Sequence, residues 1–145
     1  NKAMALKIIV YGSKEYEQMV ALRYQILRKP LGLEFSPEEL EKEKNNLLFG
    51  FFEEDSLEGC CMLVETAKGT VRLRQMAVVS GLQGKGMGRA LVIFAENVAR
   101  DRRFKKIIMH ARKAAIPFFE KLGYHTSGDE FIELTIPHVV MEKEL

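Results

Sequence analysis

A glycine-rich segment has the residue types and spacing to do chemistry in this sequence of 145 residues. Gln83-Gly84-Lys85-Gly86-Met87-Gly88 places a glycine at every second position, directly before a stretch with helical spacing. Glycine has no Cβ and lets a ligand approach the backbone, while a helix start presents unpaired N–H groups and the positive end of the helix dipole. With Lys85 and Arg89 beside them, these donors suit an anion such as a pyrophosphate.

The same glycines are also typical of a turn that only allows tight packing between a strand and a helix, and the spacing alone leaves this alternative open. The segment is not a Walker loop, because no Gly-Lys-Ser/Thr follows four residues after a first glycine. It also lacks the x-x gap of the dinucleotide-binding fingerprint. The spacing therefore indicates phosphate binding without naming the nucleotide.

Charge excludes one class of partner and favours another. Lys and Arg total 22 against 20 Asp and Glu, a formal net charge of +2, which is too small to predict a nucleic-acid partner. The charge is uneven, however. Residues 68–113 carry twelve Lys or Arg and only Glu96 and Asp101 as acids. Positive charge is therefore expected around the glycine segment, where a small phosphorylated cofactor would bind.

Cysteine content and hydropathy further narrow the class of protein that the sequence can encode. Cys60 and Cys61 are adjacent, so they cannot join distant segments, and no second pair completes a zinc site. No apolar run approaches the roughly 20 residues of a membrane span, and the first residues lack a signal-peptide pattern. We therefore expect one cytoplasmic domain over residues 1–145, with no metal and no membrane partner.

The hydrophobic spacing predicts the elements that must position the glycine segment. The expected strands cover residues 5–11, 47–53, 59–66, 70–79, 106–109, 131–136 and 138–142, and the expected helices cover residues 14–27, 37–45, a stretch after residue 84, and 114–122. A break is expected at Pro137. The mostly polar helix 37–45 is expected to be an exposed flap, and Glu96 to lie on the polar face of its helix.

This order, β-α-α-β-β-β-α-β-α-β-β, predicts an α/β fold with a mixed, mostly antiparallel sheet. A helix between two strands of one sheet normally makes a parallel crossover. Strands 70–79 and 106–109 should therefore lie parallel, with the helix after residue 84 packed between them.

Two segments together resemble the GNAT superfamily of acyl-CoA-dependent N-acetyltransferases. Residues 73–78, followed by residues 83–91, resemble its motif A, whose Gln/Arg-x-x-Gly-x-Gly/Ala pattern is met by Gln83, Gly86 and Gly88. Residues 115–124 resemble its motif B, in which an aromatic pair precedes Glu-Lys-x-Gly-aromatic. The resemblance covers nearly the whole chain and implies the GNAT fold, with a sheet splayed at its centre and flanked by helices. Residues 110–112 and 131–138 are similar to the ElaA-like bacterial branch.

The resemblance implies a site for acetyl-CoA as acyl donor. In this family the strand before the loop splays from its parallel neighbour, and the pantetheine arm pairs with its backbone as an added strand would. The positions assigned in this way to the cofactor are Met76, Ala77, Val78, Gln83, Gly84, Lys85, Gly86, Met87, Gly88, Arg89, Arg112 and Phe119.

The catalytic positions depart from the family pattern. The acid for the leaving thiolate is commonly the motif B tyrosine, which is Phe119 here, and the frequent asparagine seven residues earlier is Arg112. An acceptor amine with a pKa near ~10.4 must lose a proton before it attacks a thioester. The leading candidates for the base are Glu133 and His138. Their alternative readings are a solvent-facing strand carboxylate and a structural histidine.

The acceptor cleft is expected to have the first helix as one wall. Arg23, Tyr24 and Arg28 lie on that helix, where they would contact the acceptor or be solvated charge and wall packing. Nothing in these residues selects the acceptor, so the amine belongs to a small molecule or a peptide. The resemblance also allows a homodimer.

The sequence thus predicts an N-acetyltransferase that moves an acetyl group directly from acetyl-CoA to a primary amine in a ternary complex. One alternative is a catalytically weak CoA-binding module, because the motif B tyrosine is missing. A second alternative is a nucleotide-phosphate binder that uses the same loop.

Overall fold

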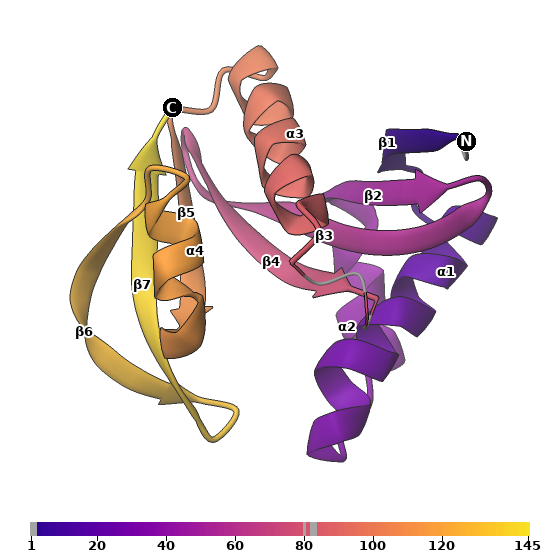
Figure 1. The fold of residues 1–145 in the computed structure, drawn as a ribbon, viewed down its shortest axis with the longest axis horizontal. Helices are drawn as coiled ribbons and strands as arrows, with labels where there is room; N and C mark the ends of the chain where they lie inside the picture. Colours follow the sequence, from indigo (N-terminus) through magenta and orange to yellow (C-terminus); the bar gives the residue numbers. More distant parts are fainter. Residues whose placement is uncertain (1–2, 80, 82–83) are drawn as a thin grey trace. The chain divides into compact units, whose positions relative to one another are not determined.

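The structure is a computed structural model that describes residues 3–79, 81 and 84–145. Its strands form a seven-stranded sheet in the order β1-β2-β3-β4-β5-β7-β6 (Figure 1). The strands are β1 (Met4–Ile9), β2 (Leu47–Glu53), β3 (Ser56–Ala67), β4 (Thr70–Val78), β5 (Lys106–Arg112), β6 (His125–Glu133) and β7 (Ile136–Glu144). The helices are α1 (Lys14–Arg23), α2 (Pro37–Glu41), α3 (Met87–Asp101) and α4 (Ile116–Glu120).

The sheet is mixed, as the order of elements predicts. β4 pairs with β5 in parallel, from Thr70 opposite Lys106 to Leu73 opposite Met109. The pairs β1–β2, β2–β3, β5–β7 and β6–β7 are antiparallel. The expected parallel crossover through α3 is therefore confirmed. None of the helices in the described part of the chain is long and apolar enough to cross a membrane.

Several short helical turns extend the helices. A π-helical turn, Tyr24–Arg28, continues α1, and 3-10 turns cover Lys29–Leu31, Lys42–Asn45 and Lys113–Ala115. Ser13 caps α1, because its side chain accepts a hydrogen bond from the Tyr16 N–H. Ser36 and Glu39 form a reciprocal capping box at the start of α2.

The chain divides into two compact units, of which the first comprises residues 1–63 and 75–95. Its core contains Met19, Phe49 and Leu91, each fully buried. Phe49 contacts Phe94 of α3 edge to face, with 5.6 Å between the ring centroids. A Cβ at Gly50 would lie 2.8 Å from three surrounding side chains, so any larger residue there would require the packing around β2 to shift.

The second unit comprises residues 64–74 and 96–145. Val71, Ile107 and Met141 supply buried side chains from β4, β5 and β7. Glu96, expected on a polar face, is buried instead. Its carboxylate accepts hydrogen bonds from the Tyr124 hydroxyl (2.7 Å) and the Lys143 ammonium (3.1 Å). This network satisfies a charge that would otherwise be costly to bury.

The C-terminal hairpin differs from its prediction. Pro137 lies inside β7, and the turn falls at Leu134 and Thr135, which have φ angles of 51° and 65°. Pro137 faces Ile132 of β6, and the pairing of β7 with β5 starts one residue later, at His138. A proline is tolerated there because it stands at the start of the strand, where no N–H is required by β5.

Candidate functional site

The start of α3 has the backbone that an anion site needs. Gly84 and Gly86 have φ angles of 81° and 84°, in the left-handed region where glycine alone is unstrained. A Cβ at either position would meet no protein atom within 4 Å, so both glycines border open space. Lys85, between the two glycines, and Arg89, in the first turn of α3, are both exposed. Gln83 lies outside the described residues.

Met87 anchors this turn to the sheet. Its side chain is 7% exposed and lies against Gly59 of β3, where a Cβ would be 2.9 Å from the Met87 sulfur. The missing side chain at Gly59 therefore lets the first turn of α3 sit directly on the strand. The Met87 side chain packs in the core of its unit, so only the Met87 backbone is available to contact a ligand.

The end of β4 is irregular just before the glycine turn. The parallel pairing with β5 stops at Leu73, and Gln75 has a φ angle of 55°, which interrupts the strand as a bulge does. Met76, Ala77 and Val78 follow this irregularity, and the Ala77 side chain is buried. The backbone of these residues, in the same compact unit as the glycine turn, is where the splayed strand was expected.

Cys60 of β3 lies next to this part of β4. Its thiol is 3.6 Å from the Gln75 carbonyl oxygen. Burial raises the pKa of Cys60 to about 12, although a hydrogen bond from the Ala77 backbone opposes that shift. Burial also raises the pKa of Cys61. Both thiols are therefore neutral packing groups.

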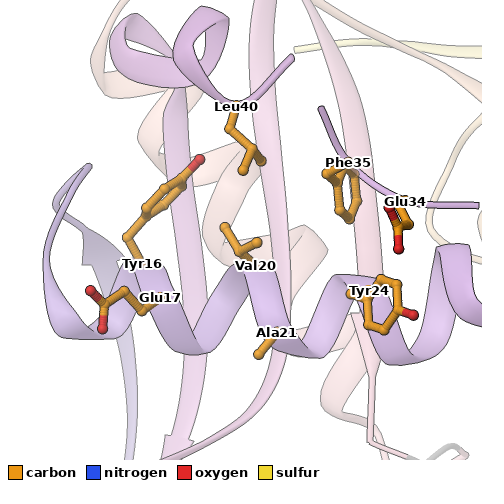
Figure 2. Close-up of a pocket in the computed structure, with 8 residues that line it drawn as sticks. All are labelled: Tyr16, Glu17, Val20, Ala21, Tyr24, Glu34, Phe35 and Leu40. Carbon is orange, nitrogen blue, oxygen red and sulfur yellow. The ribbon is translucent and has the colours of Figure 1, made fainter. Parts of the chain in front are cut away.

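A cavity of about 550 Å³ lies between α1 and the segment that leads into α2 (Figure 2). Val20 and Leu40 point toward each other across it, and the rings of Tyr24 and Phe35 line one end. Its volume falls within the range of small-molecule sites. The expected wall of the acceptor cleft thus includes a real concavity.

A buried ion pair supports the cavity. Arg23 is fully buried, and its guanidinium donates to both carboxylate oxygens of Glu43, at 2.8 and 2.5 Å. Tyr16 donates its hydroxyl to the same carboxylate at 2.7 Å. The Arg23 and Arg28 guanidiniums lie 4.7 and 4.2 Å from the centre of the Phe35 ring. The prediction of an exposed polar flap is wrong at Glu43, and Arg23 is not solvated charge.

Polar side chains also gather on one face of the second unit. The Nδ1 atom of His110 on β5 lies 2.9 Å from both Glu133 Oε2 and Arg72 Nη2. With a proton on Nδ1, His110 donates to Glu133, and without one, Nδ1 accepts from Arg72. Burial acts to raise the pKa of Glu133, but the His110 hydrogen bond and the charges of His110, Arg72 and His138 lower it. Glu133 is therefore a partnered carboxylate and not a freely solvated one.

His138 lies beside this group. Its side chain is 6% exposed, and Nδ1 lies 2.7 Å from the Ile136 carbonyl oxygen. Because a carbonyl only accepts, this contact places a proton on Nδ1 and leaves Nε2 as the basic atom of a neutral ring. Phe131 stacks on the His138 ring and meets His110 edge to face. The structure thus brings Glu133 and His138 to the same hairpin.

The remaining predicted positions have different surroundings. Arg112 is exposed at the end of β5, opposite His138 in the strand pairing. Phe119 is 7% exposed and packs edge to face on Phe118 and Tyr124. Among the residues that the structure describes, no group of three or more His, Cys, Asp or Glu is arranged to hold a metal ion.

Sequence reasoning missed the polar partners that shape these sites. Glu43 was hidden in a polar helix, and Arg72 in a strand that carries no motif at that position. A carboxylate at the seventh position of a helix gives no signal that an arginine twenty residues earlier will bury against it. His110 is not among the leading base candidates predicted from the sequence, although it connects Glu133 to Arg72.

Comparison with known proteins identifies the family. Residues 15–145 match the model of the acetyltransferase (GNAT) domain. A relative from Bacillus subtilis, named "Putative acetyltransferase", is 29% identical over 108 residues, which cover 65% of this chain and 74% of that protein. The B. subtilis protein YyaT is 32% identical over 76 residues, 52% of this chain, and the match spans about half of YyaT (51%).

Solved structures share the fold. A crystal structure titled "putative N-acetyltransferase" from Lactobacillus plantarum has a TM-score of 0.85 at 25% identity and covers 97% of this chain and 99% of its own. Escherichia coli ElaA has a TM-score of 0.83 at 14% identity, with 98% and 100% covered. An aminoglycoside 6'-N-acetyltransferase complexed with coenzyme A has a TM-score of 0.83 at 17% identity, with 97% and 96% covered. The match of the family model over nearly the whole chain, on a fold with the predicted order of elements, shows that the chain belongs to the GNAT acetyltransferase family.

Proposed function

We propose that this chain is an N-acetyltransferase that moves the acetyl group of acetyl-CoA directly to a primary amine in a ternary complex. The observation that carries the proposal is the left-handed glycine turn that opens α3, with Lys85 and Arg89 exposed beside it. A CoA-type donor is further supported by the coenzyme A bound in the aminoglycoside N-acetyltransferase that shares the fold.

The glycine turn fits a pyrophosphate on three grounds. Gly84 and Gly86 border open space that any larger residue would enter. The fifteen-residue helix α3 directs its positive end to the same place. Lys85 and Arg89 supply two more positive charges. In the proposal, Met76–Val78 hold the extended part of the donor through their backbone, and the donor supplies an activated thioester.

His138 is the better supported of the two base candidates. Its Nδ1 hydrogen bond leaves Nε2 able to accept a proton from an amine. Glu133 has a lowered pKa, which makes its carboxylate a weaker base. Glu133 is then a positioning residue that fixes His110. A His138→Gln variant should lower kcat of the transfer reaction by about a hundredfold or more, whereas Glu133→Gln should lower it much less.

A thiol-release assay tests the proposed activity. The protein is mixed with acetyl-CoA and a panel of aryl, alkyl, polyamine, aminoglycoside and peptide amines, and free CoA thiol is followed with a chromogenic disulfide. Amine-dependent thiol release, with an acetylated amine in the mass spectrum, is the expected result.

Two other outcomes favour the alternatives. CoA binding with no thiol release across the whole panel would identify a catalytically weak binding module. A larger thermal shift with ATP than with CoA would identify a nucleotide-phosphate binder and overturn the CoA assignment.

A further inference from the structure

The cavity on α1 has an apolar interior and an acidic rim. Val20 and Leu40 face it, together with the rings of Tyr24 and Phe35. Such walls favour a ligand with a hydrocarbon or aromatic body, because contact with them removes apolar surface from water. Polyhydroxylated ligands would lose hydrogen bonds to water without replacing them along these walls.

The ionisable groups at the rim are carboxylates. Glu34 lies beside Tyr24 at one end of the cavity, and Glu17 lies on α1 nearer the other end (Figure 2). Within the described residues, no hydrogen bond or ion pair engages either carboxylate group. A cation placed between the Glu34 carboxylate and the Tyr24 ring would gain attraction from both.

The neighbouring cations are already neutralised. Arg23 is paired with Glu43, and Arg28 with Glu39 at 3.1 Å. Both guanidiniums lie on the Phe35 ring, where they fix its orientation. The residues that line the cavity therefore include two acids and no base, although the chain as a whole is slightly basic.

The walls are held in place before any ligand arrives. The Tyr16 hydroxyl is bound to Glu43, and burial, followed by that hydrogen bond, raises the Tyr16 pKa well above its ordinary value. Tyr16 thus stays neutral and fixed. The π-helical turn that begins at Tyr24 is a geometry found frequently at functional sites. A preformed cavity reduces the entropy lost on binding.

We propose that this cavity binds a hydrophobic primary amine in its ammonium form, with the charge between Glu34 and Tyr24 and the apolar body between Val20 and Leu40. This assignment concerns what the cavity binds. The further step, that the bound amine is the acyl acceptor, rests on the proposed function. It selects aryl- and alkylamines from the acceptors that the family allows.

Three probes with one body and different charge test the assignment: phenethylamine hydrochloride, 2-phenylethanol and 3-phenylpropionate. Calorimetry without CoA is expected to show the ammonium binding about fivefold more tightly than the alcohol. This is the gain in affinity expected from one partly exposed charge contact. The carboxylate is expected to bind most weakly. High salt should reduce the preference for the ammonium over the alcohol.

Two variants, each with a matched control, locate the site. Glu34→Gln should abolish the preference for ammonium over alcohol, whereas Glu38→Gln, an exposed acid of α2 outside the cavity, should keep it. Val20→Trp should fill the cavity and weaken the binding of all three probes, because Val20 points across the cavity toward Leu40. Gln25→Trp, on an exposed position of the next turn, should not weaken them.

Equal binding of ammonium and alcohol would overturn the assignment, as would full affinity in Val20→Trp. The transfer assay separates this result from failure of the proposed function. If the binding pattern holds but no amine releases thiol, the acetyltransferase proposal fails and the cavity assignment stands. If other amines release thiol but the pattern is missing, the cavity assignment alone fails.

Discussion

The buried ion pair between Arg23 and Glu43 makes a residue-scale prediction about stability. Removing one partner leaves the other charge buried and uncompensated, since Arg23 is 0% exposed. Glu43→Gln should therefore lower the free energy of unfolding by about 3–5 kcal/mol. The matched control is Glu39→Gln, because Glu39 pairs with Arg28 at the surface and glutamine keeps the capping box. We expect less than about 1 kcal/mol there. Urea denaturation measures both, and equal losses would contradict the buried-pair argument.

Glu133 makes a second residue-scale prediction, about pH. Its pKa in the folded protein is lowered from an ordinary value of 4.5, so its contribution to stability is present above that value. The contribution is lost as pH falls through the lower, folded pKa. Between about pH 6 and pH 3 the wild type should therefore lose more stability than Glu133→Gln, by under about 1 kcal/mol because the carboxylate is partly exposed.

Chemical denaturation across this pH range measures the Glu133 effect. Glu130→Gln is the control, since Glu130 lies on the same strand with a surface partner, Lys113, at 3.1 Å. Parallel stability curves for the wild type and Glu133→Gln would show that the His110 contact does not hold the carboxylate ionised.

At the scale of elements, the turn before α3 makes a prediction about glycine substitutions. The place of the substituted glycine should affect CoA binding more than the backbone strain that the substitution causes. Gly86 and Gly128 have φ angles of 84° and 81°, and a Cβ at either would meet nothing within 4 Å. Glutamate at either position should therefore cost a similar, small amount of stability, about 1 kcal/mol. Only Gly86→Glu places a side chain and a negative charge at the start of α3.

Calorimetric titration with CoA distinguishes the two glycine variants. Gly86→Glu should lose CoA affinity by about a hundredfold or more, whereas Gly128→Glu, in β6, should bind like the wild type. Unchanged CoA affinity in Gly86→Glu would mean that the pyrophosphate binds elsewhere.

The elements themselves were largely predictable because their apolar spacing is regular. The parallel crossover followed from one helix between two strands, and it appears as the pairing of Thr70–Leu73 with Lys106–Met109. The π-helical turn Tyr24–Arg28 was not predictable, since one extra residue per turn barely changes a pattern of mixed three- and four-residue steps. The break predicted at Pro137 was wrong, because a proline interrupts a strand only where a neighbouring strand needs an N–H at that position.

The candidate site was predictable only where local sequence sets the backbone. The glycine turn could be predicted since left-handed φ angles require glycine. Glu43 and Glu96 could not be, because each is buried by partners distant in sequence: Arg23 for Glu43, and Tyr124 with Lys143 for Glu96. Ion pairs between residues distant in sequence leave no periodic pattern in the sequence, so the polar helix faces that carry these two glutamates were expected to face solvent.

At the scale of the whole molecule, the uneven charge makes a prediction about salt. Residues 68–113 hold twelve basic residues against two acids, while the whole chain carries only +2. Raising the ionic strength from about 0.01 M to 1 M shortens the Debye length from about 30 Å to about 3 Å. Under the proposed function, CoA affinity should therefore fall by about tenfold over this range, or about 1.4 kcal/mol. Pantetheine, which lacks the phosphates, should bind with no such dependence.

Variants separate the local contribution of the turn from that of the general field. Lys85→Gln and Arg89→Gln should each reduce the salt dependence of CoA binding, since both cations are exposed beside the glycine turn. Lys121→Gln removes an equally exposed charge from the end of the α4 segment and should leave the salt dependence unchanged. If all three variants reduced it equally, the attraction would come from net charge alone, and the glycine turn would not be the place where the phosphates bind.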